Sequence, residues 1–198
     1  MASSERDERK RGRFREYVRG IVADRFVFVD ECSTNIALGP IYARAPKGER
    51  ARGSAPRNWG KNVSLVCAID AFGVKPSMSV EGAVDAKAFE AYVGRFLAPK
   101  LKRGQIVVMD NLSVHKSRRV ERLIEEAGCE LLFLPPYSPD MNPIEEAFSK
   151  VKGALRKAGA RTREALVEAT GRALDTITPQ DIRGFYADCG YRLPLQSM

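Results

Sequence analysis

The chain has 198 residues, of which 44% are hydrophobic and 29% are charged, and its formal net charge is +8. This length suits one domain that buries a single core. No apolar run approaches the ~20 residues that a membrane span needs, and the charged N-terminus lacks the apolar centre of a signal peptide. We therefore expect a soluble, cytoplasmic protein with no membrane partner.

The first part of the chain predicts a strand, a hairpin and a helix. Residues 1–24 are densely charged and are expected to form a linker or tail, with room for a short helix around 14–18. RFVFVDE (25–31) is typical of a buried strand that ends in acids. Residues 62–70 and 74–82, separated by a turn, predict a β-hairpin. Apolar residues at helical spacing predict a helix over 85–101, for which Asp85 is a candidate N-cap.

The second part alternates strands with helices. QIVVMDN (105–111) and CELLFLP (129–135) predict buried strands on either side of a helix over 113–128, with Ser113 as its N-cap and Gly128 ending it. Helices are then expected from 142 to about 157, over 162–177 with Thr162 as cap, and over 179–188, followed by a tail at 191–198. Strand–helix–strand order implies parallel pairing with right-handed crossovers, and the hairpin implies an antiparallel edge. The fold class is therefore a mixed α/β sheet with helices on its faces.

A basic segment lies between the first predicted strand and the hairpin. Residues 44–61 hold six basic side chains against one acid, together with a tryptophan, three glycines and two prolines. Cations that could contact phosphates, with an aromatic plane for stacking, fit a nucleic-acid contact surface. A solvated loop explains the segment equally well. The candidate DNA-binding residues are Arg44, Lys47, Arg50, Arg52, Arg57, Trp59 and Lys61.

Two of the predicted strands end in aspartate, Asp30 and Asp110. If the two strands are parallel neighbours, both carboxylates lie at the edge where open α/β sheets place their sites. Two such negative charges are unfavourable side by side unless a cation lies between them. The alternative is that each aspartate only starts a turn or caps a helix. Asp70 also ends a strand, but it leads into the hairpin, so we expect it to form a turn at the opposite edge.

The stretch PPYSPDMNPIEEAFSKVK (135–152) leads two glutamates into a helix. Asn142 is a suitable N-cap, and Pro143 falls at the first helical position. Glu145 borders the apolar stripe that packs on the sheet, whereas Glu146 lies on the far side, where Lys150 at i+4 could pair with it. Asn142 and Glu145 also resemble a capping box, which is the structural alternative. Polar and basic side chains that suit a phosphodiester continue the Glu145 edge of the helix: Ser149, Lys152 and Arg156.

Three motifs together resemble a known family. VDE (29–31), VMDNLSVHK (108–116) and LPPYSPDMNPIEEAFSKVK (134–152) are similar to the DDE transposases of the mariner-like superfamily, specifically their bacterial insertion-sequence branch. Asp110 and Glu145 are separated by 34 residues, the acid spacing of that group. The resemblance covers residues 25–190, which we take as the catalytic domain.

The resemblance implies a ribonuclease H-like fold, with a mixed five-stranded sheet and helices on both faces. It implies that Asp30, Asp110 and Glu145 are the catalytic and metal-binding triad for two Mg²⁺ ions, which Mn²⁺ could replace. Asp30 would bridge the two ions. The implied reactions are cleavage of DNA at the transposon ends and transfer of their 3′-ends into target DNA, and the implied assembly is a homodimer on DNA.

The motifs carry further expectations. His115 and Lys116 follow Asp110 at the start of a helix, where they could contact a phosphate. The prolines before Glu145 would limit how far its side chain moves. Relatives carry helix-turn-helix domains ahead of the catalytic core, and only about 24 linker-like residues precede it here. We therefore expect either a truncated chain or a separately encoded helix-turn-helix partner.

Two rival functions remain. Another metal nuclease of the ribonuclease H-like fold would share Asp30 and Asp110, but the 34-residue spacing and the NPIE helix start argue against it. A repurposed DNA-binding remnant without activity would be marked by loss of a triad acid, and all three acids are present.

Overall fold

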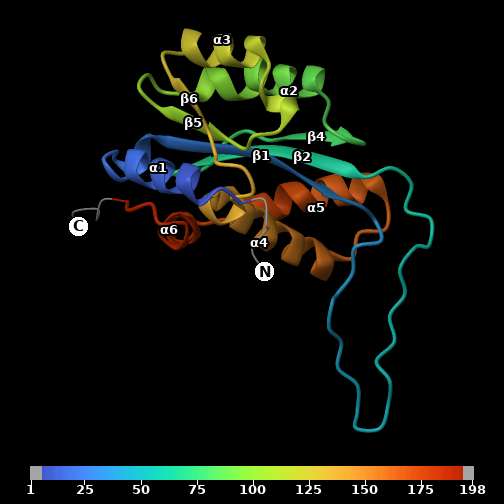
Figure 1. The fold of residues 1–198 in the computed structure, drawn as a ribbon. Coiled ribbons are helices and arrows are strands. Elements are labelled where there is room, and N and C mark those ends of the chain that lie inside the picture. The colour runs from blue at the N-terminus through green and yellow to red at the C-terminus, as the bar shows by residue number, and fades with distance from the viewer. Residues whose placement is uncertain (1–5, 194–198) are drawn as a thin grey trace.

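Residues 6–193 are described by the computed structural model, and in this range six strands form one sheet (Figure 1). The order is β3-β2-β1-β5-β6, and β4 also pairs with β2. The predicted hairpin is present, but its second strand is divided around Pro76, which lacks the N–H of a ladder bond, so the sheet has six strands and not five. The strands are β1 (Phe26–Thr34), β2 (Val63–Asp70), β3 (Gly73–Val74), β4 (Met78–Glu81), β5 (Ile106–Met109) and β6 (Glu130–Phe133).

The parallel pairing predicted for the second half of the chain and the antiparallel hairpin are confirmed, whereas the antiparallel pairing of β1 with β2 was not predicted. β1 runs parallel to β5, and β5 runs parallel to β6, whereas β1 and β2 are antiparallel. Asp70 lies opposite Val27 near the start of β1, so it is at the far edge from Asp30 and Asp110. Its carboxylate accepts a hydrogen bond from the Phe72 N–H (3.0 Å) and pairs with Lys75. The expectation that Asp70 forms a turn at the opposite edge is confirmed.

Helices cover both faces of the sheet (Figure 1). The upper face in Figure 1 carries α2 (Ala86–Tyr92), extended by further helical turns to Lys100, and α3 (Arg118–Glu126). The lower face carries α1 (Glu8–Arg19), α4 (Pro143–Ala158), α5 (Arg163–Asp175) and α6 (Pro179–Asp188). No helix within residues 6–193 is both long and apolar enough to cross a membrane.

The alternation of β1 decides which way its acids point. Phe26 and Phe28 belong to the core beneath α4, α5 and α6, whereas Val27 and Val29 belong to the core beneath α2 and α3. Successive side chains of a strand point to opposite faces. Asp30 is therefore directed to the α4 side of the sheet, and the residue after it, Glu31, to the α2 side.

The charged N-terminal segment is more structured than expected. Its described part holds the three-turn helix α1, whose Phe14 is buried in the core and whose Arg11 is completely buried. At the other end, Tyr191 is buried against the rings of Phe26 and Phe28, so it belongs to the core and not to a tail. Residues 1–5 and 194–198 of the expected tails lie outside the described range.

Two of the four predicted N-caps make their capping bonds. Asp85 accepts the Ala88 N–H (2.8 Å) and Thr162 accepts the Ala165 N–H (3.1 Å). The expectation for Ser113 was wrong: residues 113–115 form a short 3₁₀ turn, and Ser117 caps α3. The helix therefore begins at Arg118 and not directly after Ser113.

Candidate active site

Three acids from distant parts of the chain line one cavity of about 380 Å³. Asp30 lies in β1, Asp110 directly follows β5, and Glu145 is in the first turn of α4. β1 does not end at Asp30 as expected but continues to Thr34 alongside β2, so Asp30 lies where β5 leaves the sheet. The remaining lining residues are polar or apolar, and none is basic: Asn111, Leu112, Leu134, Pro135, Pro136, Tyr137, Ser138, Pro139 and Asn142.

Asp30 is the most buried of the three acids, with 6% of its surface exposed. Its Oδ1 accepts the Glu31 N–H (2.8 Å) and its Oδ2 accepts a hydrogen bond from Asn142 Nδ2 (2.7 Å). Burial, helped by the nearby Asp110 and Glu145 carboxylates and opposed by the Glu31 N–H, raises the pKa of Asp30 to about 7. The ionised form of Asp30 is therefore disfavoured, first by its burial and then by the two neighbouring carboxylates.

Asn142 has a role that the sequence did not reveal. It occupies the N-cap position of α4, and Pro143 is the first helical residue, as predicted. However, its side chain makes no capping bond and donates instead to Asp30. The capping-box alternative for Glu145 is therefore wrong. An asparagine before a helix is explained so well by capping that the sequence gave no sign of the contact with Asp30.

His115 links Asp110 to Glu31. Its Nε2 hydrogen-bonds Glu31 Oε2 (2.8 Å), and its Nδ1 lies 2.6 Å from Asp110 Oδ1 as an ion pair. The ring is completely buried and packs against Phe89 with centroids 4.3 Å apart. Burial opposes the charge of the imidazole, but the two carboxylates outweigh it and raise the pKa of His115 to about 9.

This environment corrects one expectation. A completely buried imidazole that is bound to two carboxylates does not reach a DNA phosphate, so the predicted phosphate contact of His115 is wrong. The motif gave only a basic residue near a helix start, and the short 3₁₀ turn that carries it folds inward. Lys116 is exposed, and its contact with phosphate stays a prediction.

Glu145 lies at the cavity as its helical position indicated, but the expectation that Glu146 is the solvent-facing glutamate was wrong. Glu145 is exposed and lines the cavity, whereas Glu146 is half-buried on the side of α6. Burial and the Asp188 carboxylate raise the pKa of Glu146. The expected pair between Glu146 and Lys150 was wrong, because Lys150 Nζ lies 2.6 Å from Asp181 Oδ2 on α6.

The other predicted DNA contacts lie away from this cavity. The basic segment runs out from the body between β1 and β2 in Figure 1, and none of its residues lines the cavity. All seven of its candidate residues are exposed: Arg44, Lys47, Arg50, Arg52, Arg57, Trp59 and Lys61. On α4, Ser149 is exposed and Lys152 and Arg156 are half-buried. Their contacts with DNA stay predictions.

The donor set fits a divalent cation. Carboxylate oxygens are the ligands that Mg²⁺ prefers, and the cavity joins three of them with no basic side chain. Within residues 6–193, however, no group of three or more Asp, Glu, His or Cys side chains is arranged, as the side chains stand, so that it could hold a metal ion. The contacts of Asp110 with His115 and with the Leu112 N–H (3.0 Å) both use its Oδ1.

The fold is that of the catalytic domain of Mos1 mariner transposase. In the Mos1 strand transfer complex, the match has a TM-score of 0.73 and 22% identity, and covers 96% of this chain and 61% of that one. The Mos1 catalytic domain with raltegravir and Mg matches with a TM-score of 0.69 and 20% identity over 96% of this chain and 94% of that one. A further structure of the Mos1 catalytic domain matches with a TM-score of 0.65 and 18% identity over 98% of both chains.

The chain thus spans about three fifths of the transposase in that strand transfer complex and nearly all of its catalytic domain. At these identities the likeness shows the ribonuclease H-like fold. No curated protein matches the sequence. A sequence model of the DDE superfamily endonucleases matches residues 25–167, which include all three acids of the cavity. The chain belongs to the DDE superfamily endonuclease family.

Proposed function

We propose that this chain is the catalytic domain of a DDE transposase, which cuts DNA at transposon ends and joins their 3′-ends to target DNA. The observation that carries the proposal is the meeting of Asp30, Asp110 and Glu145 around one cavity without a basic residue. Family membership and the likeness to Mos1 transposase support the same conclusion.

The three acids would hold the metal. We expect two Mg²⁺ ions, with Mn²⁺ able to replace them, and the Mos1 catalytic domain has been solved with each of these metals. Bound metal supplies a lowered pKa for an attacking water or DNA 3′-hydroxyl and neutralises charge on the leaving oxygen. The cavity lining supports this role, because it holds three carboxyl groups and no basic side chain that could pair with them.

The protein groups around the acids orient them. The Asn142 amide and the Glu31 N–H each fix one oxygen of Asp30. His115 and the Leu112 N–H hold Asp110 Oδ1, which leaves its second oxygen for the cavity. Glu145 is on the first turn of α4, whose N-terminus is set by Pro143. Together these contacts hold three carboxylates at one edge of the sheet.

DNA is the proposed partner. The net charge of +8 and the exposed basic segment 44–61 support phosphate binding, as do Ser149, Lys152 and Arg156 on α4. The solved relatives include complexes of Mos1 transposase with transposon ends. We further propose that the active form is a homodimer, because two transposon ends must be processed together. Helix-turn-helix domains that select the ends would come from another part of the protein or from a separate chain.

A strand-transfer assay tests the proposal. Duplexes carrying the DNA ends that flank the coding region, with free 3′-hydroxyls, are incubated with the protein and a target plasmid in Mg²⁺, Mn²⁺ or EDTA. We expect joined products with either metal and none in EDTA. Cleavage of RNA–DNA hybrids without any joining would instead support a ribonuclease H-like nuclease. Binding of DNA without cleavage or joining in either metal would support an inactive remnant.

A further inference from the structure

Two apolar side chains stand exposed at the candidate active site. Tyr137 and Leu112 line the cavity together with the three acids, and they expose 55% and 50% of their surfaces. They come from different parts of the chain, the turn after β6 and the turn after β5. Scattered exposed apolar residues are ordinary, but two that line the same cavity as the catalytic candidates form a surface that an apolar ligand group could cover.

The backbone of Tyr137 is held in an unfavourable conformation. Its φ is 53°, and it is the only non-glycine residue with a positive φ in the described range. A bulky residue in the left-handed region is a genuine outlier, and such conformations persist only where the surroundings enforce them. Contacts around this turn must therefore hold Tyr137 in its left-handed conformation.

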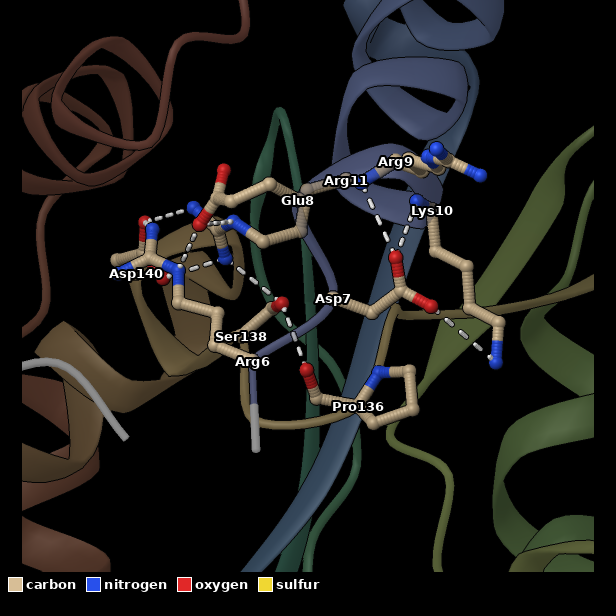
Figure 2. Close-up of polar contacts among 9 residues, drawn as sticks. All are labelled: Arg6, Asp7, Glu8, Arg9, Lys10, Arg11, Pro136, Ser138 and Asp140. Carbon is tan, nitrogen blue, oxygen red and sulfur yellow. Dashed lines mark hydrogen bonds and ion pairs between the residues drawn. The ribbon is translucent and has the colours of Figure 1, made fainter. Parts of the chain in front are cut away.

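A buried arginine on α1 holds the turn (Figure 2). Arg11 Nη1 donates to Ser138 Oγ (2.7 Å) and to Asp140 Oδ1 (3.0 Å), and Nη2 donates to Asp140 Oδ2 (2.6 Å). Ser138 Oγ in turn donates to the Pro136 carbonyl (3.2 Å). The contacts thus fix the residues on both sides of Tyr137. Figure 2 shows the guanidinium of Arg11 facing the turn from a helix more than 120 residues earlier in the sequence.

The contacts of Arg11 are strong enough to fix a strained turn. A planar guanidinium that binds a carboxylate through both nitrogens gives a directed, charge-assisted contact. Arg11 is completely buried, and Arg6 adds a second cation 3.0 Å from Asp140 Oδ2. If these contacts served only to anchor α1, they would not require a tyrosine in a left-handed conformation among the residues that line the cavity.

We propose that Tyr137 is a stacking platform for a nucleobase next to the phosphate that the three acids process, and that Arg11 is the positioning residue that holds it there. This inference rests on the proposed function. Every base has a planar face that can stack on an aromatic ring, and Leu112 offers a second apolar side chain in the lining of the same cavity. The phosphate would bind at the acids and their cations. The base next to this phosphate is therefore the part of the DNA that would contact the apolar side chains.

Paired substrates separate this role from a structural one. The first is an intact duplex, and the second lacks one base at a nucleotide next to the scissile phosphate, tested one position at a time. We expect Tyr137→Ala to slow cleavage of the intact duplex about ten-fold or more, and Tyr137→Phe to retain the wild-type rate. On the duplex that lacks the stacked base, the wild type and Tyr137→Ala should cleave at the same rate.

Tyr137→Gly provides a variant in which folding and stacking are expected to separate. Glycine adopts a positive φ without strain, so the variant should unfold at the same or a higher urea concentration than the wild type, yet cleave as slowly as Tyr137→Ala. A 2-aminopurine base at the same nucleotide gives a readout without catalysis, since its fluorescence should be quenched by the wild type and not by Tyr137→Gly. An equal loss of rate on intact and abasic DNA, or unchanged quenching in Tyr137→Gly, would overturn the stacking role.

Arg11 is tested with a matched neighbour. Arg11→Met should reduce the difference in rate between intact and abasic DNA, whereas Arg13→Met, exposed on the same helix, should leave it unchanged. If Arg11→Met lowers both rates by the same factor, Arg11 does not position Tyr137. If the wild type shows no metal-dependent cleavage of any DNA, the proposed function fails. If it cleaves and Tyr137 has no effect, only this inference fails.

Discussion

His115 is held between two carboxylates, with Nδ1 2.6 Å from Asp110 and Nε2 2.8 Å from Glu31. Asp110 follows β5, and Glu31 is in β1 on the α2 side of the sheet, so one imidazole ties two neighbouring strands together at the candidate active site. The ring itself is completely buried. It thereby compensates charge on a candidate metal ligand from the side opposite the cavity.

Replacing His115 should therefore affect both stability and metal binding. His115→Ala leaves two carboxylates without their shared cation, and we expect the free energy of unfolding to fall by about 3 kcal/mol. Loss of a group that orients a ligand should also weaken Mn²⁺ binding by about ten-fold or more. Urea unfolding in EDTA and calorimetric Mn²⁺ titration measure the two effects. Lys116→Ala, at the exposed next residue, is the control. A variant as stable as the wild type would show that the bridge contributes little.

Asn142 gives a second test at the same cavity. Asn142→Ala leaves the buried Asp30 Oδ2 without its donor, which should lower the free energy of unfolding by about 1–3 kcal/mol in EDTA. Added Mg²⁺ should recover part of the loss, because a cation can neutralise the same oxygen. The exposed Asn111, which lines the same cavity, provides the control Asn111→Ala. If the two substitutions lower the free energy of unfolding equally, the loss of the hydrogen bond to Asp30 is not the cause of the destabilisation.

The parallel pairing and the common edge of the acids could be predicted because both follow from local patterns. Asp30 and Asp110 each end an apolar strand, so they meet if the two strands are parallel neighbours, and the helical position of Glu145 directed it to the same edge. The length of β1 could not be predicted in this way. β1 passes Asp30 and continues to Thr34 because β2 remains paired with it after β5 has ended.

The contacts that orient the acids could not be predicted, because each residue that makes them already had a simpler local explanation in the sequence. Asn142 looked like a helix cap, and His115 looked like a phosphate ligand. Arg11 looked like one more charge in a charged segment. Only the position of Phe14 three residues later, on the same helical face, could have indicated that Arg11 faces the protein. Its partners, Ser138 and Asp140, are too far along the chain for any spacing rule to reveal them.

The adjacent glutamates of α4 should differ sharply in activity. Glu145→Gln should abolish Mg²⁺-dependent DNA cleavage, because it removes a carboxylate from the cavity. Glu146→Gln should retain most of the activity, since Glu146 faces α6 and Asp188. Cleavage of labelled duplexes at saturating Mg²⁺ measures both. Equal loss from the two substitutions, or loss from neither, would contradict the assignment of Glu145 as a metal ligand.

The basic segment should contribute to DNA affinity and not to metal binding. Replacing Arg50, Arg52 and Arg57 with alanine should weaken DNA binding and reduce the slope of log K against log salt by up to about three, because each phosphate contact contributes about 0.9. Affinity is measured by fluorescence anisotropy at several salt concentrations. The control replaces three exposed basic residues of α2 and α3, which are Lys87, Arg118 and Arg122. An unchanged slope in the loop variant would exclude the segment as a DNA contact.

The contact between Arg11 and Asp140 should appear in the acid dependence of stability. Its hydrogen bonds from Arg11 hold the pKa of Asp140 below its usual value. A carboxyl group whose pKa is lowered on folding stabilises the protein above its unfolded pKa of about 3.9, and this contribution is lost as the pH falls through the lower, folded pKa.

The wild type should therefore be more stable than Asp140→Asn above about pH 4.5, and the difference should shrink steadily at lower pH. Because Asp140 is half exposed, solvent screening limits the difference to about 1 kcal/mol. Urea unfolding between about pH 6 and 2.5 measures it, and Asp175→Asn at the exposed end of α5 is the control. The same difference should vanish in an Arg11→Met background, because the cation that lowers the pKa is then absent. A difference that persists there would assign the effect to Arg6, the other cation beside Asp140.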